Sequence, residues 1–152
     1  MPLRVLILED NPDDAQLMVR ELRYAGLDVQ AERVETEAEF VGQLTPEPDL
    51  ILSDFTLPHF GGLAALQLVR SRGLAVPFIV VSGSIGEDIA VQAMREGADD
   101  YLLKDRIARL GPAALRALEN RRMRAHLRRT EDALRETELK FRQIAENVKD
   151  LL

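Results

Sequence analysis

The chain has 152 residues, of which 46% are apolar and 30% charged, a composition typical of a globular protein. It contains no cysteine, which excludes disulfides, thiolate metal sites and cysteine nucleophiles. It also lacks an export signal and an apolar run of about 20 residues, so we expect a cytoplasmic chain without a membrane span.

The charge is unevenly distributed along the chain. Residues 1–112 hold 10 basic and 19 acidic residues, a net charge of −9, whereas residues 113–152 hold 10 basic and 7 acidic ones, a net charge of +3. An acidic body is a poor binder of polyanions and a suitable binder of cations. The basic stretch at residues 121–129 indicates either a nucleic-acid contact or a solvated helix face. We favour the solvated face and expect no nucleic-acid partner.

Five strands are predicted, because short apolar runs alternate with segments of helical periodicity. The strands cover residues 3–8, 29–34, 50–53, 77–81 and 101–103. Helices are expected over residues 12–25, 36–44, 63–72, 87–96 and from 111 onward. This alternation predicts an α/β fold in which helices cover both faces of a parallel sheet. Leu115 and Leu118 are expected to pack the last helix on the sheet.

Polar residues follow the carboxyl ends of four of these strands. Glu9 and Asp10 follow the first strand, Asp54 follows the third, Ser82 the fourth and Lys104 the fifth. Open parallel sheets bind ligands at this edge, where the strand order reverses. Three carboxylates, a hydroxyl and an ammonium are therefore expected to form one site.

This set of groups suits phosphoryl transfer. Oxygen ligands without His or Cys favour a hard cation, so Mg²⁺ is the expected cofactor. A carboxylate in a neutralised site can attack phosphorus and form an aspartyl-phosphate. The metal, the Lys104 ammonium and the Ser82 hydroxyl with nearby backbone N–H groups would share the charge of the transition state.

The ordered motifs of the chain resemble the receiver domain of two-component response regulators over residues 3 to about 120. The resemblance implies a flavodoxin-like, doubly wound five-stranded parallel sheet of order 2-1-3-4-5 with five helices, the last extended into a long coiled-coil-like helix. The motifs are Glu9-Asp10, Asp54 with Leu57-Pro58 and Gly61-Gly62, Val80-Val81-Ser82-Gly83, and the run from Gly97 to Lys104.

The resemblance also implies a role for each residue of the site. Asp54 would be the phosphoacceptor. Asp10 would bind Mg²⁺ directly, Glu9 through water, and Asp54 and the backbone carbonyl of Thr56 would complete the metal ligands. The remaining roles are the switch hydroxyl, the switch aromatic and the phosphate-binding lysine, implied for Ser82, Tyr101 and Lys104.

Structural roles are the alternatives for some of these residues. Asp10 would then be only a helix N-cap, although Asn11 can cap the helix instead. Ser82 would be only the last residue of a strand. Tyr101 would be an ordinary core or surface aromatic residue. His59 is interpreted as a solvated loop residue.

The chain departs from the family pattern at two positions. Glu9 stands where Asp is commoner, and its longer side chain still permits a water-mediated contact. Asp105 follows Lys104 where the family usually has proline after a cis bond. A cis bond without proline costs about 2.5–4 kcal/mol, so we expect a trans bond and a different loop.

A heptad pattern marks the C-terminal segment. Leu127, Leu134, Phe141 and Val148 repeat at seven, and a second series repeats at the same interval, offset by three, with members Met123, Thr130, Thr137, Ile144 and Leu151. This a/d pattern predicts a parallel homodimeric coiled coil. The alternative is an apolar stripe that docks on the chain's own body.

Residues 1–120 are therefore predicted to form a receiver domain, and residues 121–152 a helical coiled-coil linker. Residues 141–152 resemble the lead-in to a PAS sensor domain, so we expect the chain to be a fragment whose downstream PAS-like domain is missing. We expect no stand-alone enzyme beyond Mg²⁺-dependent self-phosphorylation and autodephosphorylation. A longer protein would fit a hybrid sensor kinase.

The predicted function is a phosphoacceptor module that takes a phosphoryl group from a histidine kinase or a histidine phosphotransfer protein. The first alternative is a receiver-fold dimerisation scaffold that is not phosphorylated. The second is an aspartyl-nucleophile phosphohydrolase. That class carries a second Asp two residues after its nucleophile, where this chain has Thr56.

Overall fold

The computed structural model describes residues 1–83 and 86–151. It divides the chain into two compact units, Met1–Glu119 and a second unit that begins at Asn120. Leu152, the last residue of the predicted helical segment, lies outside the described residues.

The first unit contains a five-stranded sheet in which every pairing is parallel. The strand order is β2-β1-β3-β4-β5, as the family resemblance implied. The strands are β1 (Leu3–Leu8), β2 (Val29–Val34), β3 (Leu50–Ser53), β4 (Phe78–Ser82) and β5 (Asp100–Leu103).

Helices connect the strands, and the boundaries of α1 to α5 agree with the predicted segments to within two residues. Thr36 caps α2 through a reciprocal capping box with Glu39, and α2 ends at Gly42, earlier than predicted. The helices are α1 (Pro12–Tyr24), α2 (Glu37–Gly42), α3 (Gly62–Ser71), α4 (Glu87–Arg95), the short 3₁₀ helix η1 (Lys104–Arg109) and α5 (Leu110–Leu151).

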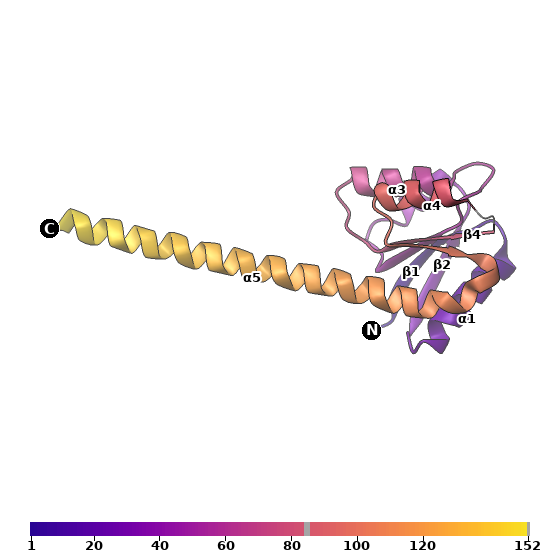
Figure 1. The fold of residues 1–152 in the computed structure, drawn as a ribbon, viewed down its shortest axis with the longest axis horizontal. Coiled ribbons are helices and arrows are strands. Elements are labelled where there is room, and N and C mark those ends of the chain that lie inside the picture. The colour runs from indigo at the N-terminus through magenta and orange to yellow at the C-terminus, as the bar shows by residue number, and fades with distance from the viewer. Residues whose placement is uncertain (84–85, 152) are drawn as a thin grey trace. The chain divides into compact units, whose positions relative to one another are not determined.

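The sheet is covered on both faces, as Figure 1 shows for α3 and α4 on one side and α1 with the first turns of α5 on the other. Two clusters of buried residues correspond to these faces. Met18 and Leu22 of α1 pack with Leu110 in one cluster, and Phe40 of α2 packs with Leu66 of α3 in the other. The buried strands β1, β3 and β4 lie between the two clusters and hold the site at their carboxyl ends.

Small residues, and not the predicted leucines, pack the first turns of α5. Leu115 is 43% exposed and Leu118 is only half-buried, whereas Ala113, Ala114 and Ala117 are buried. The expectation for Leu115 is therefore wrong. The reason is the close approach of α5 to α1. A Cβ atom on Gly111 would lie 2.9 Å from the Cβ atom of Ala25, so there is no room for a larger side chain at that position.

The chain after Lys104 follows the expectation drawn from Asp105. Thr45–Pro46 is the only cis peptide bond among the described residues, so the Lys104–Asp105 bond is trans. The backbone then forms η1, which leads directly into α5.

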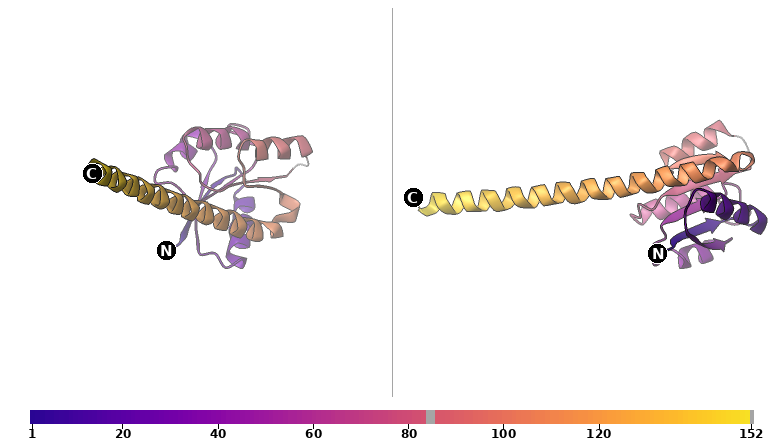
Figure 2. Two further views of the ribbon diagram at one scale, coloured as in Figure 1. Left: turned by 60° about the vertical axis from the view of Figure 1, so that its left-hand side comes forward. Right: turned by 90° about the horizontal axis from the view of Figure 1, so that it is seen from below.

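The described residues of the second unit are entirely helical. Figure 2 shows α5 as a continuous ribbon in both views. The apolar side chains of the heptad pattern are exposed here. The Thr130 and Thr137 hydroxyls donate to the carbonyls four residues earlier, at 3.0 and 2.9 Å. No helix in the described part of the chain is both long and apolar enough to cross a membrane.

Candidate functional site

The carboxyl ends of the strands bring the predicted charged residues together. Glu9 follows β1, Asp54 follows β3 and Lys104 follows β5. Carboxylate oxygens of Glu9, Asp10 and Asp54 all lie within 4.8 Å of one another. The predicted acidic cluster is therefore present in the fold.

The Lys104 ammonium lies at the centre of the cluster. Its Nζ atom donates to Asp54 Oδ2 at 2.9 Å, to Glu9 Oε1 at 3.0 Å and to Asp14 Oδ2 at 2.9 Å. Burial alone would lower the pKa of Lys104. The hydrogen bonds to the three carboxylates outweigh that effect and raise the pKa above its ordinary value. Lys104 is thus held in its charged form beside Asp54.

Asp54 is fixed from two directions. Its backbone N–H donates to the Leu8 carbonyl at 2.9 Å, which ties the end of β3 to β1. Its Oδ1 atom accepts a hydrogen bond from the Thr56 N–H at 3.2 Å. Gly62 packs closely behind, since a Cβ atom there would lie 2.7 Å from the Asp54 carbonyl oxygen. The side chain remains 9% exposed.

Glu9 is completely buried, an unusual place for a carboxylate. Burial raises its pKa from 4.5 to about 7, although the hydrogen bond from Lys104 acts in the opposite direction. The neighbouring Asp54 charge raises the pKa further. Its Oε2 atom has no hydrogen-bond partner among the described residues, which leaves a buried acceptor unsatisfied.

Asp10 is exposed and does not cap α1. Asn11 is the N-cap, and its side chain accepts from the Asp13 N–H at 2.9 Å. The Asp10 carboxylate is therefore free to face the other two acids of the cluster.

The donor set fits a divalent cation. An ion with its bound water beside the three carboxylates would supply a partner for the Glu9 Oε2 atom and offset the repulsion between the acids. The oxygen-only composition of the cluster is the one that Mg²⁺ prefers.

The other predicted residues lie near the strand ends. Ser82 ends β4 and is buried, whereas Thr56 is exposed in the loop after Asp54. Tyr101 lies in β5 opposite Val80 and packs partly buried against the cluster on the α3 side. His59 is exposed, as expected.

Asp14 was not among the predicted site residues, although it contacts Lys104 directly. Asp14 lies in the first turn of α1, four residues after Asp10, and helical side chains point towards the N-terminus of their helix. The position of Asp14 in the first turn of the helix could have predicted this contact, because its side chain points back towards the sheet edge where the site lies.

The fold and the strand-end acidic cluster are those of a receiver-type domain, and comparison with known proteins agrees on the family. The sequence model of one protein family, the response regulator receiver domain, matches residues 5–115. The chain therefore belongs to that family.

Three similar proteins illustrate the relationship. The cell cycle transcriptional regulator CtrA of Caulobacter vibrioides is 33% identical over 102 residues, which cover 67% of this chain and 44% of CtrA. The alkaline phosphatase synthesis transcriptional regulatory protein SphR of Synechococcus elongatus is 32% identical over 142 residues, which cover 88% of this chain and 52% of SphR. The signal receiver domain of the response regulator NarL from Mycobacterium tuberculosis superposes with a TM-score of 0.67 at 27% identity. The superposition covers 78% of this chain and 97% of the NarL domain.

The chain spans about half the length of the curated relatives that it matches. Those relatives are named as transcriptional regulators. The expectation that this chain has no nucleic-acid partner therefore stays a prediction.

Proposed function

We propose that this chain is the phosphoacceptor receiver module of a bacterial two-component phosphorelay and that Asp54 accepts the phosphoryl group. The observation that carries the proposal is the contact of Lys104 Nζ with Asp54 Oδ2 at 2.9 Å, beside two further carboxylates. A scaffold without phosphorylation has no physical need for a buried Glu9 whose Oε2 atom is left unsatisfied.

The reaction is an in-line transfer of a phosphoryl group. An Asp54 carboxylate oxygen attacks phosphorus and forms the acyl-phosphate bond, while the bond from phosphorus to the donor atom breaks. The electron pair of that bond leaves with the donor, which is a phosphohistidine nitrogen in a kinase or phosphotransfer protein. Lys104, already in contact with Asp54, stabilises the negative charge on the transferring oxygens.

The expected cofactor is Mg²⁺, which Asp10 and Asp54 would hold directly and Glu9 through water. The backbone carbonyl of Thr56, next to the N–H that already contacts Asp54, is the proposed fourth protein ligand. When bound, the ion would neutralise the carboxylates and draw charge from the phosphoryl oxygens.

Ser82 and Tyr101 are the proposed switch residues. Ser82 ends β4, next to the β5 strand that carries Tyr101. A hydroxyl at this strand end is suited to bind a phosphoryl oxygen on Asp54. Movement of Ser82 would be transmitted along β4 to the neighbouring aromatic residue.

The proposed output passes through α5. We assign residues 1–120 to the receiver domain and residues 121–152 to a linker that pairs with a second copy and leads to a PAS-like domain. The support is the exposed apolar heptad pattern, since helices in proteins gain most of their stability by packing an apolar face, and the apolar residues of this pattern are exposed. A cytoplasmic location and a histidine kinase or phosphotransfer partner belong to the same proposal.

Incubation with acetyl phosphate and Mg²⁺, followed by intact-mass measurement, tests this function. The wild type should gain the mass of one phosphoryl group and Asp54→Asn none, because an amide is not a nucleophile. Asp132→Asn, an exposed change on α5, is the matched control and should label like the wild type. A wild type that gains no mass while remaining folded would favour the scaffold alternative.

A further inference from the structure

A groove of about 730 Å³ lies between α1 and the edge strand β2. Ile7, Ala15, Val19 and Ala31 are among its apolar lining residues, and basic residues of both elements also line it. None of the residues to which we assign phosphoryl or metal binding lines the groove.

The small side chain at residue 31 explains the groove. Successive side chains of a strand alternate between its faces, so Ala31 shares a face with Val29 and Arg33. Val29 is buried beneath α1, but Ala31 is too short to fill the space beside it and is exposed.

The outer edge of β2 is open to strand pairing. β2 pairs only with β1 in the five-stranded sheet, so in the described part of the chain no strand pairs with its other edge, although the Arg23 side chain contacts the Val29 carbonyl there. An extended segment that added to this edge would place every second side chain over the groove.

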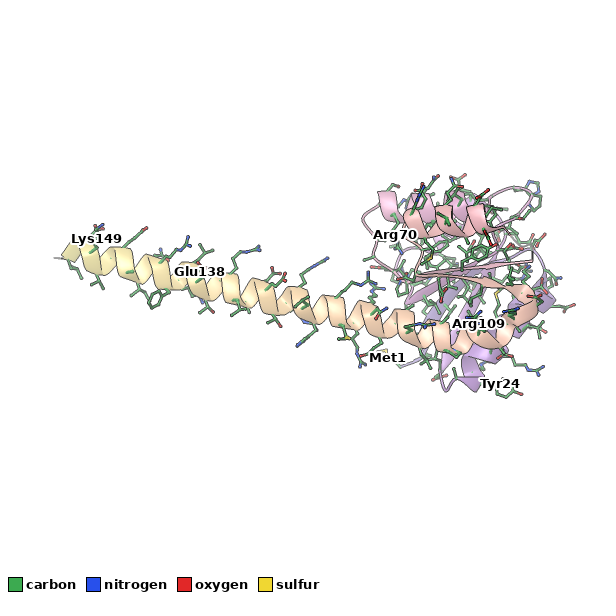
Figure 3. The ribbon with its side chains drawn as sticks, in the orientation of Figure 1. Met1, Tyr24, Arg70, Arg109, Glu138 and Lys149 are labelled. Atoms are coloured by element: carbon green, nitrogen blue, oxygen red, sulfur yellow. The ribbon has the colours of Figure 1, made fainter. Side chains whose placement is uncertain are left out.

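The rim of the groove is basic, although residues 1–112 carry a net charge of −9. Arg20 lies 5.5 Å from the ring centre of Tyr24, which is 73% exposed and lies at the outer edge of the first unit in Figure 3. Arg23 donates to the Val29 carbonyl at 3.4 Å. Neither arginine pairs with a carboxylate among the described residues. Arg33 adds a third guanidinium, which is paired with Glu35.

We propose that this groove binds an extended acidic protein segment, which adds as a strand to β2 and places acidic side chains on either side of an apolar one. The acids would meet Arg20, Arg23 and Arg33, and the apolar side chain would enter beside Ala31. The opposite face of β2 carries Gln30 and Glu32, so side chains on that face of the segment should be neutral.

The charges select this occupant over two others. A nucleic acid would be repelled by the acidic body and would not use the backbone edge of a strand. A second copy of β2 carries Val29, Ala31 and Arg33 on this face and no acid, so it would add positive charge to a rim that is already basic.

The test uses the five-residue probe Glu-Thr-Val-Thr-Glu, acetylated and amidated, titrated into the isotopically labelled full chain. We expect the amide resonances of Val29–Val34 to shift in a saturable manner. The double variant Arg20→Glu/Arg23→Glu should weaken binding by about tenfold or more. Ala31→Leu, which fills the groove, should also weaken it. Arg72→Glu, an exposed change at the end of α3, is the matched control and should bind like the wild type.

Two control peptides separate the contributions of charge and groove. Lys-Thr-Val-Thr-Lys should not bind, and Glu-Thr-Thr-Thr-Glu should bind more weakly because it cannot fill the apolar space. The proposal is overturned if the first probe leaves the β2 amides unmoved at millimolar concentration. Equal binding of both acidic peptides would also overturn it, since the surface would then be only a patch of positive charge.

Discussion

Glu9 shows how strongly the fold acts on a single side chain. Glu9 follows an apolar strand, and this position buries it completely. One of its oxygens accepts from Lys104, and the other has no hydrogen-bond partner in the part of the chain that the structure describes. The protein tolerates this arrangement because Lys104 carries a full charge at the centre of three acids. Such a cluster is less stable by itself than with a cation bound.

Glu9 predicts a pH dependence of stability in the absence of divalent cations. The folded chain holds a proton on Glu9 up to about pH 7, whereas the unfolded chain releases it near the ordinary pKa of 4.5. The folded state therefore binds more protons between these values, and the free energy of unfolding should fall as the pH rises through this window. Urea unfolding in a chelator measures the slope. Glu9→Gln should flatten it, and Glu87→Gln on the exposed surface is the control. An unchanged slope in Glu9→Gln would contradict the assigned burial.

The metal ligands predict a second result. Mg²⁺ should raise the melting temperature, because it binds the folded cluster and not the unfolded chain. At about 100 times its Kd the gain is about 2.7 kcal/mol. Asp10→Asn should reduce this shift more than Glu9→Gln, since a direct ligand contributes more than a water-mediated one. Equal shifts in the wild type and Asp10→Asn, measured by thermal unfolding with and without Mg²⁺, would remove Asp10 from the metal site.

At the residue level, strand ends were sufficient to predict that Glu9, Asp54 and Lys104 meet. Glu9, Asp54 and Lys104 each follow a buried strand of one parallel sheet, and this topology dictates their proximity. Asp14 was missed because it lies on a helix, where only the direction of the side chain returns it to the sheet edge. Complete burial of Glu9 also depends on packing that periodicity does not encode.

The interface between α1 and α5 shows, for whole elements, what apolar periodicity predicts and what depends on packing. Apolar periodicity predicted the strands and most helices, because burial on one or both faces imposes that pattern. It failed after Leu110 in α5, where the short distance between two helices, and not hydrophobicity alone, selects the side chains. Gly111 and three buried alanines meet α1 or the sheet, while Leu115 faces solvent.

Gly111→Ala should therefore destabilise the protein. The added Cβ atom would lie 2.9 Å from Ala25 Cβ and 3.1 Å from the Glu21 carbonyl oxygen, so α1 and α5 must move apart. Overpacking of this kind costs about 1–3 kcal/mol. Gly42→Ala is the matched control. It lies in α2 with no atom within 4 Å of the new Cβ, and should be neutral or stabilising by up to about 1 kcal/mol. Equal free energies of unfolding for the two variants would contradict this packing.

For the molecule as a whole, the exposed heptad pattern predicts a parallel homodimer. Leu127→Glu combined with Leu134→Glu should give a monomer that is still phosphorylated, because burying each leucine contributes about 1.5–3 kcal/mol to the dimer. Leu139→Glu is a matched control. Leu139 is as exposed as Leu127, at 58%, but lies off the a/d seam. Truncation after Asn120 should likewise yield a phosphorylatable monomer.

Sedimentation velocity distinguishes the two arrangements of the segment that follows Asn120. A wild-type chain that remains monomeric at high micromolar concentration would reject the coiled coil. Dissociation by Leu139→Glu as complete as that by the double variant would show that the seam is assigned to the wrong positions.

The most direct test of the central claim is to locate the phosphoryl group after labelling with acetyl phosphate and Mg²⁺. Borohydride reduces an aspartyl-phosphate to homoserine, and peptide mass spectrometry then identifies the modified position among the 26 acidic residues of the chain. The proposed function predicts homoserine at residue 54 alone. Homoserine at another acid, or labelling of Asp54→Asn at the wild-type rate, would contradict it.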